Sequence, residues 1–310
     1  MILVMGASGS VGASTVEHLL IQGVAPSQII AGARNTEKLS ALANVGVQTR
    51  RADYLDPIGM EAAFQGVDTL ILIPTKTPAP QRCVEHGNAL ESARAAGVGR
   101  IVFLSLQAAV PTSAFSVAPF ILFAECATRQ AVRDWVMARM SLYIDPVAEW
   151  VPELVTMGRL PYPLKEARIA YVSRNDVSRS LAAIARQREL SHEVVELTGP
   201  AALSMPELAA DLSAFTESQI VFRSIEDAEY REICRKDGTP DEIVEILASM
   251  YRAAEAQEFS NVTADIERLT GVPPETVKQA LARLAGAGRP AASLSVSANN
   301  NQEIPGERKR

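Results

Sequence analysis

Three glycines near the start of the chain carry the clearest chemical signal in the sequence. The apolar run Ile2–Met5 leads directly into Gly6-Ala7-Ser8-Gly9-Ser10-Val11-Gly12, and a helical pattern follows. Glycines at this spacing let the backbone turn tightly and approach a pyrophosphate, which then lies on the free N–H groups of the helix. The alternative is a tight strand–helix turn without a ligand. We favour a dinucleotide site whose predicted contacts are Gly6, Ser8, Gly9, Ser10, Val11 and Gly12.

The type of dinucleotide is indicated by the residues that end the next apolar strand. An NAD-selective site places Asp or Glu there to accept a hydrogen bond from the ribose 2′-hydroxyl. This chain has Arg34 instead, with Lys38 one helical turn later and no acid before Glu37. A guanidinium matches a phosphate through two parallel hydrogen bonds. The pair therefore predicts NADP(H), although an exposed Arg and Lys on a solvated helix start would give the same pattern.

Further candidates follow other predicted strands, where ligands of open α/β sheets bind. They are Asp53 and Tyr54 after the third predicted strand, Ile73, Pro74 and Thr75 at the end of the fourth, and Ser105 at the end of the fifth. We expect the first pair to reach the adenine edge, with an ordinary loop turn as the alternative. The group after the fourth strand is expected to line the ribose and pyrophosphate, and the serine to face the same crevice.

The acid–base pair that short-chain reductases normally carry is missing. That pair is Tyr-x-x-x-Lys, in which the tyrosine donates a proton and the lysine lowers its pKa. The residues four positions after the six tyrosines are Ile58, Val147, Glu166, Asn175, Cys234 and Glu255. None of them is lysine, so any reaction here proceeds without that pair.

The elements that must position these residues alternate between strand and helix. The predicted strands are 2–5, 28–33, 46–50, 69–73, 100–105 and 136–140, and the predicted helices between them are 14–22, 36–43, 58–64, 81–96 and 123–135. Apolar runs and helical spacing set these bounds. The alternation predicts an α/β fold with a Rossmann-type doubly wound parallel sheet and helices on both faces.

Beyond the sixth strand the pattern loosens, which predicts a smaller mixed α/β C-terminal substrate domain. Its expected elements are a helix at 145–157, a strand at 168–172, a helix at 175–186 and a long helix at 241–256. Asp145 is expected to cap the first of these helices, with Pro146 at its first position.

Three parts of the chain are therefore expected. Residues 1–140 form the nucleotide-binding domain, and later segments such as 168–187 return to it. Residues 141–285 belong mainly to the substrate domain. The tail 286–310 is rich in Gly, Ala, Ser and Asn, which predicts disorder.

Composition disfavours several classes of partner. A formal net charge of −6 disfavours a nucleic-acid partner, which needs a basic surface. No apolar run approaches the ~20 residues of a membrane span, and no basic leader precedes the first apolar stretch. Three widely spaced cysteines give neither a disulfide framework nor a metal site. We therefore expect a cytoplasmic protein without metal, membrane or nucleic-acid partners.

Several motifs together resemble the atypical short-chain dehydrogenase/reductases, and more narrowly the NmrA-like branch that contains type 2 NADPH:quinone oxidoreductases and triphenylmethane reductase. The resemblance covers roughly residues 1–285, and its motifs are Gly6–Gly12, Ala33–Asn35, Arg51–Asp56, Ala95–Val98, Phe103–Ser105 and Leu269–Pro274. It implies a nucleotide-binding domain with a smaller C-terminal domain, NADP(H) and a flat conjugated substrate. Two departures, Glu125-Cys126 where relatives often have Glu-Lys and Arg139-Met140-Ser141 where they often have Arg-Pro or Arg-Asn, indicate a reworked pocket.

A conjugated acceptor also fits the missing acid. Reducing an isolated ketone creates an alkoxide, and losing the general acid typically costs ~10²–10⁴ in rate. Reducing a quinone-like ring creates a phenolate-type anion, whose conjugate acid has a pKa of about 10, so water can protonate it. Ser105 is then a candidate hydrogen-bond donor, Glu125 a candidate proton relay, and Tyr143 or Trp150 a candidate ring platform. Core packing or a solvated position is the alternative for each.

The leading hypothesis is an NADPH-dependent reductase that transfers hydride to a quinone or a quinone-like polycyclic aromatic ketone. A tailoring step on an aromatic natural product is one setting for such chemistry. Two alternatives stay open: a non-catalytic NADP(H)-binding redox sensor that regulates a protein partner, and an isomerase or dehydratase that converts its substrate without net cofactor change. The sequence also leaves a homodimer open.

Overall fold

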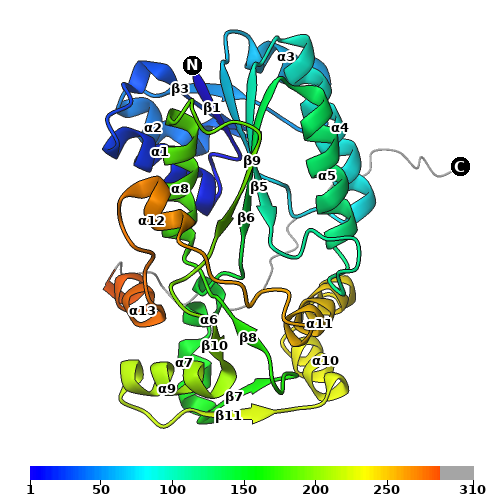
Figure 1. Cartoon of the computed structure of the whole chain (residues 1–310), viewed down its shortest axis with the longest axis vertical. Coiled ribbons are helices and arrows are strands. Elements are labelled where there is room, and N and C mark those ends of the chain that lie inside the picture. Colours follow the sequence, from blue (N-terminus) through cyan, green and yellow to red (C-terminus); the bar gives the residue numbers. More distant parts are fainter. Residues whose placement is uncertain (287–310) are drawn as a thin grey trace, which may run out of the picture.

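A seven-stranded sheet forms the centre of the computed structural model, which describes residues 1–286 (Figure 1). All strands in this sheet are parallel, and their order is β3-β2-β1-β4-β5-β6-β9. They are β1 (Ile2–Met5), β2 (Ile29–Ala33), β3 (Gln48–Arg51), β4 (Thr69–Leu72), β5 (Arg100–Leu106), β6 (Asp134–Met140) and β9 (Glu193–Leu197). The order reverses between β1 and β4, which confirms the predicted Rossmann-type doubly wound sheet.

Helices cover both faces of this sheet. In β1, the neighbouring side chains of Leu3 and Val4 point to opposite faces, and both are fully buried. Val4 packs in a core shared with α1 and α8, whereas Leu3 packs in a core shared with α3, α4 and α5 (Figure 1). The helices of this part are α1 (Ser10–Ile21), α2 (Ser40–Asn44), α3 (Pro57–Phe64), α4 (Ala79–Ala95), α5 (Ala118–Ala131), α8 (Arg174–Arg186) and α12 (Asp265–Thr270), with short 3₁₀ turns η1 (Pro26–Gln28) and η2 (Thr36–Leu39).

A smaller lobe lies beyond the carboxyl ends of the central strands (Figure 1). It holds a parallel pair, β7 (Arg159–Tyr162) with β11 (Val221–Ser224), and an antiparallel pair, β8 (Arg168–Ile169) with β10 (Leu203–Ser204). Its core is rich in aromatic side chains, including Trp150. Its helices are α6 (Asp145–Glu149), α7 (Val151–Met157), α9 (Met205–Thr216), α10 (Asp227–Lys236), α11 (Asp241–Glu255) and α13 (Val277–Gly286).

The chain passes between the two parts several times. After β8 in the smaller lobe, α8 packs on α1, and β9 then joins the large sheet beside β6. After α11, α12 packs on α8. Within the predicted returning segment 168–187, α8 therefore lies with the large sheet and β8 does not. The boundaries 1–140 and 141–285 remain a prediction, and the predicted disordered tail lies outside the described residues apart from Gly286.

Several predicted elements have the wrong bounds: the predicted helix 14–22 begins at Ser10, and the predicted strand 168–172 is only β8 (Arg168–Ile169). Two further helices differ for a local reason. The predicted helix 145–157 is two helices that meet at Trp150, because α7 begins with a proline at its first turn and proline has no N–H for a helix interior. Asp145 is not the N-cap: Ile144 is, and the Asp145 carboxylate accepts a hydrogen bond from the Arg174 N–H at 2.9 Å. The predicted helix 123–135 is α5, which ends earlier because Val132 is extended.

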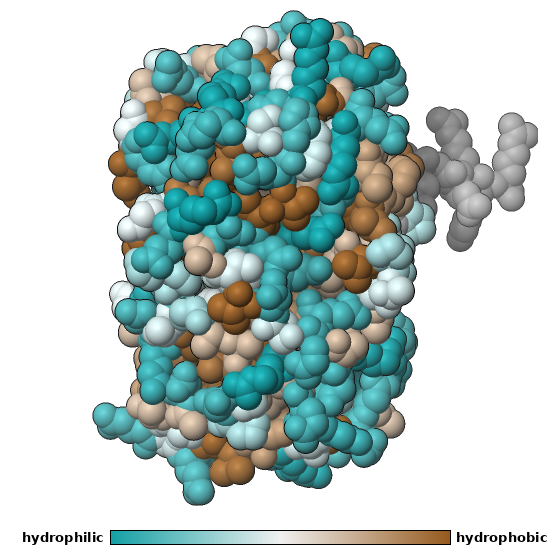
Figure 2. All heavy atoms as spheres, in the orientation of Figure 1, coloured by the Kyte–Doolittle hydropathy of each residue, from teal (hydrophilic) through white to brown (hydrophobic). Residues whose placement is uncertain are grey.

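The face of the molecule in Figure 2 shows no single large hydrophobic patch of the kind that binds a macromolecular partner. Hydrophobic and hydrophilic side chains are intermixed there. The large exposed apolar residues lie on separate elements, such as Ile21 on α1, Ile58 on α3 and Phe123 on α5. No helix within residues 1–286 is long and apolar enough to cross a bilayer. The homodimer stays a prediction.

Candidate functional site

The glycine loop joins β1 to α1 in a shape that side chains would obstruct. Gly6 has a φ of +69°, a left-handed conformation that favours glycine, and its carbonyl accepts the N–H of Gly9 at 2.9 Å. A Cβ on Gly12 would lie 2.3 Å from that same carbonyl oxygen. Gly9 caps α1 without a side-chain hydrogen bond, and Ser8 and Ser10 are exposed. The helix start therefore presents backbone N–H groups to an anion, which fits a pyrophosphate.

The end of β2 lies next to this loop. The Ala7 N–H donates to the Gly32 carbonyl at 3.0 Å, which ties the two turns together. Arg34 and Lys38 follow on the surface, and neither forms an ion pair within residues 1–286. The Asn35 side chain accepts the Glu37 N–H at 2.9 Å and fixes the turn. Arg34 and Lys38 thus place two positive charges beside the glycine loop. Their contact with a 2′-phosphate remains a proposal.

Asp53 and Tyr54 are held by the protein itself. The Asp53 carboxylate accepts the Leu55 N–H at 3.1 Å, which is a local turn. The Tyr54 hydroxyl donates to the Ile73 carbonyl at 2.8 Å and so fastens this loop to the end of β4. Burial raises the pKa of Tyr54, with the nearby Glu85 charge acting in the same direction, so the phenol is neutral. Both residues lie at the carboxyl edge of the sheet, as predicted, and their contact with adenine remains a prediction.

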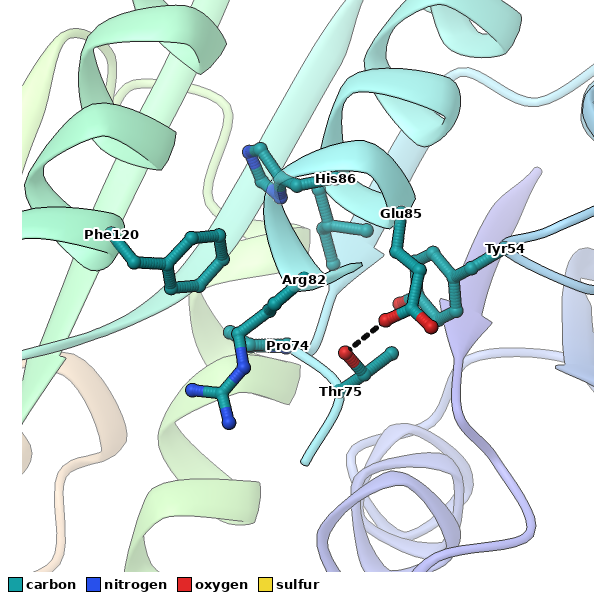
Figure 3. A pocket seen from close by; sticks show the side chains of 8 residues that line it. Tyr54, Pro74, Thr75, Arg82, Glu85, His86 and Phe120 are labelled. Atoms are coloured by element: carbon teal, nitrogen blue, oxygen red, sulfur yellow. Dashed lines mark hydrogen bonds between the residues drawn. The ribbon is translucent and has the colours of Figure 1, made fainter. Parts of the chain in front are cut away.

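Ile73, Pro74 and Thr75 lead from β4 towards α4 past a small cavity (Figure 3). Its volume is about 10 Å³, space for roughly one water molecule. Its walls are Tyr54, Leu72, Pro74, Thr75, Arg82, Glu85, His86 and Phe120. The buried Glu85 carboxylate accepts the Thr75 hydroxyl, the Thr77 hydroxyl at 2.6 Å and the Gln81 amide at 2.9 Å. These bonds fix the β4–α4 loop.

Ser105 and Glu125 are brought together, but in a closed cluster. Ser105 on β5 donates to Glu125 on α5 at 2.6 Å. Arg139 on β6 binds both carboxylate oxygens at 2.8 Å, and Arg129 binds one at 2.9 Å. Burial alone would raise the pKa of Glu125, but the hydrogen bonds from Arg139 and Ser105 outweigh it and lower the pKa. Glu125 is therefore an anion held by two guanidinium groups. The Ser105 hydroxyl donates its hydrogen to this carboxylate and not to a ligand.

Tyr143 lies at the boundary between the large sheet and the smaller lobe, and Trp150 lies within the smaller lobe. Tyr143 pairs with Val172 in an isolated bridge, and the Arg174 guanidinium lies 5.6 Å from its ring centroid. Burial raises the pKa of Tyr143, which makes it a weak proton donor. Trp150 is buried and packs 5.8 Å from Tyr162, between ring centroids. The structure thus gives Trp150 a core position.

Three polar residues at this edge had no place in the predicted site. Arg82 and Glu85 line the cavity from the first turns of α4. Gln107 follows β5 and donates to the Glu196 carboxylate at 3.0 Å, while its own amide oxygen is buried without a partner within residues 1–286. The only sequence signal for the first two is their spacing of three on a helix that follows a strand end, which is common on any helix surface.

The parallel sheet, the glycine loop and the uncapped start of α1 define a Rossmann-type dinucleotide-binding protein. The chain belongs to the NmrA-like family, which it matches over residues 1–280.

Similar proteins extend over nearly the whole chain. Quinone oxidoreductase 2 of Escherichia coli strain K12 is 28% identical over 92% of this chain and 98% of its own length. The crystal structure of the E. coli NADPH-dependent quinone oxidoreductase with NADPH has a TM-score of 0.87 and covers 92% of this chain and 100% of that one. The Citrobacter triphenylmethane reductase with NADP(H) has a TM-score of 0.86 at 28% identity over 91% of this chain and 99% of that one. A Staphylococcus aureus structure described as a nucleoside-diphosphate-sugar epimerase has a TM-score of 0.85 at 28% identity over 90% and 99%.

Proposed function

We propose that the protein reduces a quinone or a quinone-like polycyclic aromatic ketone with NADPH. The observation that carries the proposal is that none of the acid–base candidates is a ready proton donor. Ser105 and Glu125 bind each other and two arginines, and burial makes Tyr143 a weak acid. A site of this kind suits an acceptor whose reduced form is a stabilised anion that water protonates.

The protein is an NADP-dependent oxidoreductase of the NmrA-like family. Bound NADPH supplies a hydride. The loop Gly6–Gly12 and the start of α1 would hold its pyrophosphate, and Arg34 with Lys38 would hold its 2′-phosphate. The β4–α4 loop, stiffened by Glu85, would form one wall of the acceptor site, so the protein's main contribution is to hold a flat ring in place.

Two relatives support this acceptor class. The E. coli protein is named a quinone oxidoreductase, and the Citrobacter protein a triphenylmethane reductase; both names describe enzymes that reduce conjugated compounds. A tailoring step on an aromatic natural product is one setting for this reduction.

The test is NADPH consumption, followed by absorbance, with quinones, polycyclic aromatic ketones and isolated ketones at equal concentration. We expect oxidation with the first two classes and little with isolated ketones. Tight NADPH binding with no consumption for any acceptor would instead support the redox sensor. The epimerase-like neighbour adds a third outcome, substrate conversion without net NADPH loss, which product analysis of a nucleotide-sugar incubation would detect.

A further inference from the structure

We propose that Arg82 binds an anionic group of the acceptor, so that the site prefers flat aromatic acceptors carrying a carboxylate or a sulfonate. This inference rests on the proposed function, because it specifies the acceptor of that same site. Arg82 lies in the first turns of α4, directly after the loop that ends β4. It is therefore at the carboxyl edge of the sheet, where ligands of open α/β sheets bind.

The guanidinium of Arg82 is held, yet its end is free for a ligand. Its Nε donates to the Thr77 carbonyl at 2.9 Å, and its central carbon lies 5.3 Å from the ring centroid of Phe120. Figure 3 shows the head group extending past Pro74, away from the carboxylate of Glu85. Within residues 1–286 its two Nη atoms have neither a hydrogen bond nor an ion pair. Two parallel N–H donors in this orientation suit a carboxylate or a sulfonate.

Other arginines with restricted exposure show what is unusual here. Arg100, Arg129, Arg139, Arg174, Arg179, Arg231 and Arg283 all have a carboxylate partner within 3.0 Å. Half-buried Arg50 and Arg82 have none. The Arg50 guanidinium donates instead to the carbonyls of Ala63 and Gln65 at 2.6 and 2.7 Å, whereas the Arg82 Nη atoms have no such acceptor within residues 1–286, even though Glu85 is only three residues away. The Glu85 oxygens are taken by Thr75, Thr77 and Gln81. An external anion would therefore supply the partner that the fold withholds.

The neighbouring groups leave Arg82 as the cation of the cavity. His86 is buried against Phe103, and burial lowers its pKa to about 4, so it is neutral at physiological pH. The cavity is too small for an aromatic ring. The ring of the acceptor would lie outside it, with only the anionic group at the Arg82 head.

Redox-inert probes test this without turnover. Isothermal titration of the full chain would compare 2-naphthoate with neutral 2-naphthalenemethanol in the presence of NADP⁺. We expect the wild type to prefer the anion by about tenfold or more, and Arg82→Gln to remove that preference with little change for the neutral probe. Arg82→Lys should keep part of it. Arg94→Gln, on the same helix but in a surface pair with Glu91, is the matched control and should change nothing.

Three results would overturn the inference. One is a wild type with no preference for the anion, which needs no variant and so stands even if Arg82→Gln fails to fold. Another is an equal loss for both probes, which would mean a structural role. The third is a large rise in the Kd of NADPH in Arg82→Gln, which would assign the guanidinium to a cofactor phosphate.

The same experiments separate this inference from the proposed function. If neutral quinones oxidise NADPH but the protein shows no preference for anions, the reductase activity is supported and the role of Arg82 is contradicted. If anion binding depends on Arg82 but no quinone oxidises NADPH, the anion site is supported and the reductase activity is contradicted.

Discussion

The predicted nucleotide side and the proposed acceptor side of the carboxyl edge are built differently. The loop between β1 and α1 is made of backbone, with Gly6 and Gly12 providing the turn and the space. The β4–α4 and β5–α5 regions are made of side chains contributed by separate elements. A backbone cradle accepts any ligand with a pyrophosphate, whereas a site made of side chains is specific to the charges it presents.

Within the acceptor side, two buried carboxylates sharpen the contrast. Glu125 is neutralised by two guanidinium groups, which closes that cluster and joins α5 to β5 and β6. Glu85 is held by hydroxyl and amide groups, and the nearby Arg82 is left without it. The direct ion pairs of Glu125 stabilise the fold, whereas Arg82, which has no ion pair within residues 1–286, keeps its Nη donors available for a ligand.

The largest expected effect breaks the ion pairs of Glu125. Glu125→Gln leaves Arg139 and Arg129 without their counter-charge, and we expect it to lower the free energy of unfolding by about 3–5 kcal/mol. Glu85→Gln keeps neutral partners in place and should cost about 1–3 kcal/mol. Urea unfolding of both variants measures the difference. Equal costs would show that the two carboxylates are not distinguished by their arginines.

The next effect tests the backbone cradle. Gly12→Ala places a Cβ 2.3 Å from the Gly6 carbonyl oxygen, so the loop must shift. We expect NADPH binding, measured by fluorescence titration, to weaken by about 100-fold, or roughly 2.7 kcal/mol. Gly87→Ala in α4 is the control, because its Cβ would meet nothing within 4 Å. Unchanged NADPH affinity in Gly12→Ala would show that the loop does not hold the pyrophosphate.

The free energy of unfolding should depend on pH through His86, which lies on the proposed acceptor side. Folding lowers the pKa of His86 from 6.5 to about 4 because burial disfavours its charged form. Its contribution to stability is complete above pH 6.5 and is lost as the pH falls towards 4, since the unfolded chain then binds the extra proton. The loss between pH 7 and pH 5 is about 2 kcal/mol.

His86→Phe keeps an aromatic ring beside Phe103 and Phe120 and removes the titrating group. Unfolding at pH 7 and pH 5 should therefore show a smaller pH dependence in this variant than in the wild type. The same slope in both proteins would assign the effect to other residues.

The smallest expected effect concerns Arg34, one of the side chains proposed to bind the 2′-phosphate on the nucleotide side. Arg34→Ser removes a cation near the predicted 2′-phosphate, and we expect the Kd of NADPH to rise about tenfold. The Kd of NADH should stay within about twofold, since it has no 2′-phosphate. Equal changes for the two nucleotides would contradict the assignment of Arg34.

The contrast between the two sides also explains what sequence alone could predict. A backbone site must use residues that are consecutive in the chain, so Gly6, Gly9 and Gly12 reveal it together with the strand and helix around them. The parallel sheet follows from apolar runs at regular intervals, and most of its strands begin and end within two residues of the prediction.

The side-chain site could not be predicted in the same way. The sequence offers Glu125 and Ser105 as separate candidates, but the contacts that Glu125 makes with Ser105 and Arg139 depend on the packing of α5 over β5 and β6. Arg82 carries no local pattern that separates it from a solvated arginine. Its importance comes from the absence of a partner, which only the assembled fold shows. The bounds of α5 failed similarly, because Trp135 has helical spacing but pairs in β6.

The late arrival of β9 has a consequence for synthesis on the ribosome. β6 is complete at Met140, but the strand that covers its open edge is made only after the first elements of the smaller lobe. At roughly 5–20 residues per second, this edge waits for several seconds with unpaired backbone groups. Exposed edges of this kind attract other chains. We therefore expect nascent chains that stop before β9 to aggregate, and chaperones to bind them during this interval.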